Sequence, residues 1–336
     1  MLKKIQKKYP VNVEELDRAT RDGFETQSMY EIYGTEGAGK TQLMFSLTST
    51  VMNNNEDIRK SLGEDNKKIL SSQKRDVSLK DITVIKIGGS TLGEHDTSLQ
   101  DVVDMKLSGL NPVVVHGGGA IVSSWMKKNG IIPQFVGGLR VTNRESLDVA
   151  IAVLTGLVNK SLVAEIQSLG CLAVGISGVD GNTLIAEVVD NKLGYVGKIV
   201  DVRADLLRSL IQSGYIPIVS SVAMTKQKDN SDSLILNINA DHAAGEIARE
   251  LQADSVVFMT DVPGIMDSSR RLIPRVTKDQ AKSLINSKVI DGGMIPKVES
   301  CCRSLDFVKK TYIVDGRKSH VLRDLFDGKF SGTRIG

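Results

Sequence analysis

The 336-residue sequence is poor in aromatic side chains and in net charge. Only 4% of its residues are Phe, Trp or Tyr, which leaves few rings on which the bases of single-stranded nucleic acid could stack. The formal net charge of +3 is too small to make nucleic acid or an anionic membrane the expected partner.

Cysteines and long apolar runs are also scarce. The sequence has three cysteines, Cys171, Cys301 and Cys302. Because their number is odd and their spacing matches no metal site, we expect reduced thiols. We find no uninterrupted run of about 18 apolar residues and therefore expect no membrane span. The basic first ten residues lead into no apolar segment, unlike a secretory signal. The expected location is cytoplasmic.

The composition changes near residue 80. Residues 50–81 are polar with mixed charges, which is typical of a solvated helix or linker. After them a short β-branched run repeatedly ends in a glycine or small polar cluster, and a helical stretch follows. Such apolar strands are typical of a parallel sheet covered by helices on both faces. The runs are at 82–90, 112–119, 172–178, 216–222, 255–261 and 311–316.

Helical periodicity fills the spaces between these runs. Apolar residues recur at three- and four-residue spacing in Leu147, Ile151, Leu154, Val158 and Leu162. Residues 242–251 are also good helix formers, whereas 184–202 alternate around Asp190-Asn191 and predict an antiparallel hairpin. We predict an α/β fold, a three-layer αβα sandwich with a mostly parallel central sheet.

Glycine-containing loops lie where the predicted strands end, which is where parallel sheets bind ligands. Glycine lets the backbone approach an anion closely, and successive N–H groups at a strand-to-helix turn form an anion-binding nest. One such loop is often a plain turn, but four in this order predict phosphate binding. The loops are at 86–89, 116–119, 260–266 and 291–297.

These loops belong to a longer series of motifs that resembles a known family. The series resembles the motifs of the acetylglutamate kinase branch of the amino-acid kinase family. Its members are IKIGGS, HGGG, GLRVT (138–142), LNINAD (236–241), TDVPGI and GGMIPK. The resemblance implies an amino-acid-substrate lobe at 81–252 and a nucleotide-binding lobe at 253–336, after an extension at 1–80. It also implies ATP-dependent phosphorylation of the γ-carboxylate of N-acetyl-L-glutamate, in arginine biosynthesis.

The resemblance assigns catalysis to Lys86, Lys297 and Asp241. Phosphoryl transfer spreads negative charge over oxygens, and two fixed lysines from opposite lobes would stabilise that charge. Asp241 would hold the lysines in place and, from its position before a helix, would also suit an N-cap. No general base is expected, because a γ-carboxylate with a pKa of about 4.3 is already ionised at neutral pH. His116 is therefore interpreted as a structural hydrogen-bonding residue.

Arg140 is expected to bind the α-carboxylate of the substrate, because its planar guanidinium can bond a carboxylate bidentately. Asn237 matches the family asparagine that binds the amino acid, and Gly118 and Gly119 would donate backbone N–H groups beside it. Mg²⁺ would bridge the β- and γ-phosphates of ATP and need few protein ligands, so no metal ligand is named. The expected phosphate and nucleotide contacts are Gly88, Gly89, Thr260, Asp261, Gly264 and Ile265.

A second phosphate motif precedes the kinase-like region. Gly34, Gly39, Lys40 and Thr41 satisfy G-x-x-x-x-G-K-[ST], and the surrounding stretch resembles the nucleotide loop of archaeal RadA-type recombinases. A P-loop ATPase also needs a surrounding parallel sheet and a second strand with a magnesium-binding Asp, which the polar residues that follow do not provide. We interpret the segment as a fused fragment, either inert or an interaction arm.

Two alternatives stay open at this point. One is a kinase for glutamate or aminoadipate attached to a carrier protein, against which GLRVT argues. The other is a recombinase-like module that binds nucleic acid.

The chain ends in FDGKFSGTRIG, which departs from the GIGT-type motif of arginine-inhibited relatives, and its extension does not resemble their interlacing helix. We expect an arginine-insensitive homodimer.

Overall fold

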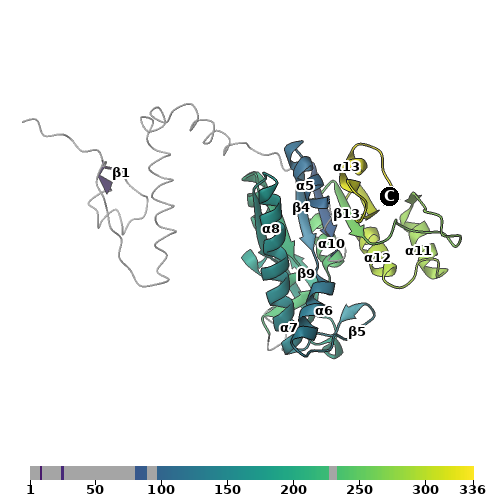
Figure 1. Cartoon of the computed structure of the whole chain (residues 1–336), viewed down its shortest axis with the longest axis horizontal. Coiled ribbons are helices and arrows are strands. Elements are labelled where there is room, and N and C mark those ends of the chain that lie inside the picture. Colours follow the sequence, from purple (N-terminus) through teal and green to yellow (C-terminus); the bar gives the residue numbers. More distant parts are fainter. Residues whose placement is uncertain (1–7, 10–23, 26–79, 89–96, 227–232) are drawn as a thin grey trace, which may run out of the picture. The chain divides into compact units, whose positions relative to one another are not determined.

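The computed structural model describes residues 8–9, 24–25, 80–88, 97–226 and 233–336 (Figure 1). The chain divides into two units, Met1–Lys74 and Arg75–Gly336. In the first unit, β1 (Lys8–Tyr9) pairs antiparallel with β2 (Phe24–Glu25). The P-loop-like motif at 34–41 lies outside the described residues, so its interpretation stays a prediction.

An eight-stranded sheet forms the centre of the second unit. Every neighbouring pair of strands is parallel except β15 and β16, which confirms the predicted mostly parallel sheet. The order is β14 (Arg275–Val276), β16 (Gly332–Ile335), β15 (Lys310–Asp315), β13 (Ser255–Thr260), β3 (Ile82–Ile87), β4 (Asn111–His116), β10 (Ile216–Ser220) and β7 (Ala173–Ser177).

Helices cover both faces of this sheet and make the predicted three layers. Alternate residues of the buried central strands enter different cores: Val84 and Val113 belong to one, and Ile85 and Val114 to the other. The first core contains residues of α9 (Asp205–Gln212), α10 (Ala240–Leu251), α11 (Lys278–Asn286) and α12 (Met294–Ser304). The second contains residues of α5 (Ser98–Leu107), α6 (Gly119–Lys128), α8 (Asn159–Ser168) and α13 (Val321–Phe326).

The two predicted lobes share this one sheet. β3, from the amino-terminal part, pairs with β13, from the carboxyl-terminal part, and the two parts lie side by side in Figure 1. The boundary expected at residue 252 therefore falls between neighbouring strands of a continuous sheet. Residues from both parts can meet at the ends of these strands.

A small closed barrel adjoins the sheet. It contains β8 (Leu184–Val188), β9 (Val196–Val202), β11 (Val222–Thr225) and β12 (Ile235–Ile238). β8 and β9 pair antiparallel, as the alternating pattern predicted, and two 3₁₀ turns flank β8, η2 (Asp180–Asn182) and η3 (Asn191–Leu193). The pairing of β8 with β11 and of β9 with β12 was not predicted. A separate hairpin joins β5 (Phe135–Val136) to β6 (Leu139–Arg140).

One helical segment, at 144–168, is continuous but not uniform. It begins as α7 (Arg144–Ile151), passes through the π-helical turn η1 (Ala152–Val158) and continues as α8. Among the described residues it alone has the length and apolar composition to cross a membrane, with a mean hydropathy of 1.7 over an 18-residue window. A count of uninterrupted apolar runs missed it. Its residues Val153, Leu154, Val158 and Leu162 belong to the second core.

Candidate active site

Three residues that are distant in the sequence meet at the carboxyl end of β3. Lys86 lies near the end of this strand, Asp241 in the first turn of α10, and Lys297 in the first turn of α12. Lys86 Nζ is 2.9 Å from Asp241 Oδ1, and Lys297 Nζ is 3.4 Å from Asp241 Oδ2. The side chains of Lys86 and Asp241 are 9% and 7% exposed, and that of Lys297 is 22% exposed. The structure thus places one carboxylate between two ammonium groups.

The charge of this cluster suits an anionic ligand. Burial of Asp241 tends to raise its pKa, but the ammonium groups of Lys86 and Lys297 outweigh burial and hold the pKa below its ordinary value. Asp241 is therefore ionised at neutral pH. Two cations and one anion leave a net positive charge at the end of the sheet, where a phosphoryl group would be stabilised.

Asp241 is not the N-cap of its helix, so this part of the sequence interpretation was wrong. Asn239 precedes α10, and its Oδ1 accepts hydrogen bonds from the backbone N–H groups of Asp241 (2.8 Å) and His242 (3.2 Å). An asparagine two residues upstream satisfies the free N–H groups of the first turn. The Asp241 carboxylate is therefore left to pair with the lysines.

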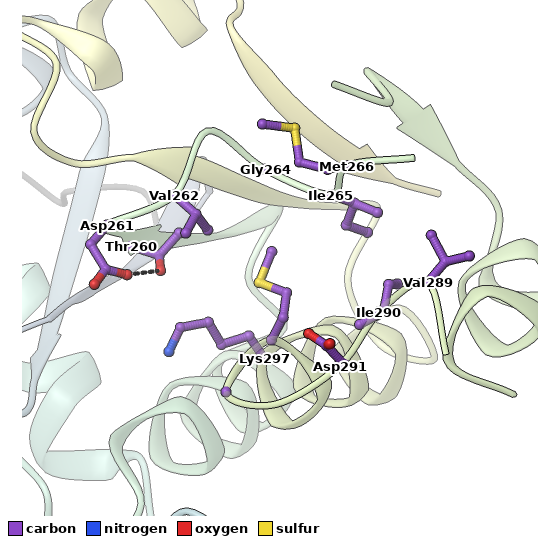
Figure 2. A pocket seen from close by; sticks show the side chains of 12 residues that line it. Thr260, Asp261, Val262, Gly264, Ile265, Met266, Val289, Ile290, Asp291 and Lys297 are labelled. Carbon is purple, nitrogen blue, oxygen red and sulfur yellow. Dashed lines mark hydrogen bonds between the residues drawn. The ribbon is translucent and has the colours of Figure 1, made fainter. Parts of the chain in front are cut away.

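A cavity of about 420 Å³ opens on the Lys297 side of the cluster (Figure 2). Thr260, Asp261, Gly264 and Ile265, the nucleotide contacts predicted in this half, all line it. Figure 2 shows the Lys297 side chain extending toward the same side of the cavity as Thr260 and Asp261, where the Thr260 hydroxyl donates to the Asp261 carboxylate over 3.2 Å. A cation at the end of a cleft of this size suits a nucleoside phosphate.

The rest of this cavity is largely apolar, and part of its lining lies outside the predicted loops at 260–266 and 291–297. Its apolar lining includes Val262, Met266, Val289, Ile290 and Met294. Val289 and Ile290 directly precede the motif at 291–297. Their position next to this motif is the sequence feature from which their place in the cavity could have been predicted. Such a lining suits the flat face of a nucleobase, whereas the charged end suits phosphates.

A second cavity, of about 190 Å³, opens on the Lys86 side. Every residue predicted to bind the amino-acid substrate lines it, namely Gly118, Gly119, Arg140 and Asn237. Lys86 and Asp241 line it as well, so the charged cluster lies between the two cavities. Sequence reasoning missed Phe135, Ser221 and Leu154, which come from the β5–β6 hairpin, the start of the barrel and the π-helical turn.

Arg140 is a buried cation in this second cavity. Its Nη2 donates to the Gly119 carbonyl and to the Ser123 hydroxyl, each over 2.8 Å, and its guanidinium lies 4.7 Å from the centre of the Phe135 ring. Burial lowers its pKa. In the part of the chain that the structure describes, no carboxylate pairs with it. A fixed guanidinium without a protein counter-charge suits a substrate carboxylate.

The phosphate loop after β3 is only partly described. Gly88 follows the strand but lines neither cavity, and Gly89 lies outside the described residues. Their expected contacts with phosphate stay predictions. Asn237 lies on β12, where its Nδ2 is 3.3 Å from Thr142 Oγ1, so its amide is oriented by the GLRVT segment before any substrate binds.

Comparisons with known proteins place this geometry in context. Residues 81–315 match the sequence profile of the amino acid kinase family. The chain is 43% identical over 258 residues to an acetylglutamate kinase of Dehalococcoides mccartyi, which covers 76% of this chain and 94% of that protein. It is 44% identical over 263 residues to an acetylglutamate kinase of Caldanaerobacter subterraneus, over 75% of this chain and 86% of that protein. A crystal structure from Streptococcus mutans superposes with a TM-score of 0.65 at 29% identity, over 76% of this chain and 98% of that one.

Proposed function

The chain belongs to the amino acid kinase family, and from that premise we propose that it transfers the γ-phosphate of ATP to the γ-carboxylate of N-acetyl-L-glutamate. The product is N-acetyl-L-glutamyl 5-phosphate, and the reaction is the second step of arginine biosynthesis. Similar acetylglutamate kinases, matched over most of their length, support this choice of acceptor.

The observation that carries the proposal is the Lys86–Asp241–Lys297 cluster at the junction of the two cavities. The larger cavity offers apolar surface and ends at Lys297, as a nucleotide donor requires. The smaller cavity holds Arg140 and Asn237 and ends at Lys86, as a small anionic acceptor requires. A phosphoryl group that passes from one cavity to the other must pass the two lysines.

The acceptor needs no general base, because its carboxylate is already ionised. The main barrier is the repulsion between this carboxylate and the phosphates of ATP. Lys86 would offset this repulsion from the acceptor side and Lys297 from the donor side, while Asp241 fixes both ammonium groups. Arg140 would hold the α-carboxylate of the acceptor, and Asn237 a polar group of the same molecule.

The residues of the larger cavity also fit a magnesium ion bound together with ATP. Mg²⁺ usually takes one or two protein carboxylates along with phosphate oxygens and water. Asp261 and Asp291 line the cavity and supply such oxygen donors. When bound, the ion would neutralise charge on the β- and γ-phosphates.

A coupled assay of ADP formation tests the proposal. We expect ADP release that depends on free N-acetylglutamate and that Lys40→Ala leaves intact. No turnover with the free substrate would favour the carrier-linked kinase. ATP hydrolysis that DNA stimulates, and that Lys40→Ala abolishes, would favour the recombinase-like module.

The assembly and the location of the protein are part of the same proposal. The resemblance favours a cytoplasmic homodimer that arginine does not inhibit, with no nucleic acid or membrane as partner. Light scattering coupled to size-exclusion chromatography, with and without arginine, measures the assembly. A hexamer, or turnover that falls as arginine is added, would contradict this part.

A further inference from the structure

His116 is buried at the end of β4, directly before the glycine loop, and both of its ring nitrogens are engaged. Nδ1 lies 2.9 Å from the Gly117 carbonyl oxygen, which can only accept, so Nδ1 carries the proton. Nε2 lies 3.1 Å from the amide nitrogen of Asn159, which can only donate, so Nε2 accepts. Burial lowers the pKa of His116 to about 4. The ring is therefore neutral and held in one tautomer.

Asn159 is itself held from several sides. Its two Nδ2 protons face three acceptors, His116 Nε2 and the carbonyls of Ile218 (2.9 Å) and Ile176 (3.3 Å), so one of these bonds is shared. Its Oδ1 accepts from Lys160 Nζ over 3.0 Å. These partners leave the amide only one orientation. Gly175 makes room for it, because a Cβ there would lie 1.9 Å from Asn159 Oδ1. Asn159 thus ties His116 to strands β7 and β10.

The π-helical turn η1 precedes Asn159 and approaches the glycine loop. Turns of this kind are frequent at functional sites. A Cβ at Gly118 would lie 2.8 Å from Leu154 Cδ2 and 3.4 Å from Val158 Cγ2, and both residues belong to η1. A larger residue at this position would therefore force the Leu154 side chain to move.

These contacts set the orientation of the peptide between Gly117 and Gly118. The peptides of the described residues are trans, so the C=O and the N–H of one peptide point in opposite directions. His116 holds the Gly117 carbonyl, which turns the Gly118 N–H away from the ring. Gly118 lines the substrate cavity, and its N–H has no hydrogen-bond partner within the described part of the chain.

We infer that His116, whose tautomer Asn159 fixes, is a positioning residue that holds the Gly117–Gly118 peptide so that the Gly118 N–H donates to an anionic oxygen beside Lys86. The inference rests on the proposed function and adds to it which residue orients the Gly118 N–H. His116 does not touch the reacting groups. It acts through the backbone, and its acid–base chemistry takes no part in the transfer.

Two substitutions of His116 separate the two hydrogen bonds. The amide nitrogen of Asn can occupy the place of Nδ1, so His116→Asn retains a donor to the Gly117 carbonyl. The longer Gln places its amide near Nε2, so His116→Gln faces Asn159 but loses that donor. We expect His116→Gln to lower kcat at least tenfold with KM for ATP nearly unchanged, and His116→Asn to retain most of the activity. A purely structural role predicts equal losses in both, in step with their melting temperatures, and that result would overturn the inference.

Titration calorimetry tests the role of His116 without the acceptor N-acetylglutamate, because it measures nucleotide binding alone. ADP with aluminium fluoride mimics the transferring phosphoryl group, whereas ADP alone does not. We expect His116→Gln to weaken binding of the fluoride complex at least tenfold and to leave binding of ADP unchanged. Equal affinity of wild type and variant for the fluoride complex would refute the role of His116. Absence of N-acetylglutamate turnover in the wild type would instead refute the proposed function and leave the calorimetric comparison valid.

Discussion

Asp241→Asn removes the one negative charge of the cluster while keeping the shape of the side chain. Lys86, whose side chain is 9% exposed, then faces an amide at a distance of about 2.9 Å instead of a carboxylate. Removal of one partner of a buried ion pair costs about 3 to 5 kcal/mol, because the other charge stays buried without compensation. Lys86 borders a cavity that water can enter, so we expect a loss near 3 kcal/mol, which is about a hundredfold in the folding equilibrium.

Asp254→Asn is the matched control. Asp254 also pairs with a lysine, at 2.6 Å, but the side chains of Asp254 and Lys309 are 36% and 78% exposed. Exposed pairs contribute about 0 to 1 kcal/mol, so this variant should unfold nearly as the wild type does. Urea denaturation at pH 7 measures both variants. Equal losses of stability would refute the idea that Asp241 compensates a buried charge.

The kinetic outcome of Asp241→Asn follows from the same charges. Loss of the carboxylate makes the cluster more positive, so binding of ATP should not weaken. The lysines lose the group that fixes them, and kcat should fall by about 10²-fold, as when a transition-state donor is lost. Initial rates over a range of ATP concentrations separate the two effects. A higher KM for ATP with unchanged kcat would contradict the role given to Asp241.

Other predictions address neighbouring residues. Lys86→Ala and Lys297→Ala should each lower kcat by about 10²-fold or more, with KM rising for the acceptor in the first and for ATP in the second; identical KM profiles would contradict the assignment of the two cavities. Because burial lowers the pKa of His116 from 6.5 to about 4, its contribution to stability is complete above pH 6.5 and falls by about 3 kcal/mol as the pH drops to 4. In His116→Asn the free energy of unfolding should change less with pH, as urea titrations at several pH values measure. The same pH dependence as in the wild type would contradict the role of His116 in it. Gly118→Ala places a Cβ 2.8 Å from a leucine methyl group and should cost about 1 to 3 kcal/mol. Gly119→Ala meets its nearest neighbour at 3.9 Å and should cost less, and urea denaturation of the two variants measures the difference.

The sequence predicted the sheet because each central strand is buried on both faces. Strands β3, β4 and β13 consist of short apolar runs that end in small or polar residues, and this local pattern is typical of a parallel sheet. The hairpin of β8 and β9 was predicted in the same way, from the alternation of apolar and polar residues along its strands. The π-helical turn was not, because a shift of the hydrogen bonds by one residue leaves the apolar spacing almost unchanged.

The members of the site were named from motifs, but their meeting depends on the packing of distant elements. Lys86, Asp241 and Lys297 come from a strand and two helices, and only the packing of α10 against β3 and α12 places both ammonium groups within 3.4 Å of the Asp241 carboxylate. The sequence also misled at α10, where a local preference of Asp for helix ends suggested a cap that Asn239 provides. Local chemistry determines which strands, turns and charged groups a chain can form. Which of these groups share a cavity depends on contacts between residues far apart in the chain, and these arise only when the layers pack.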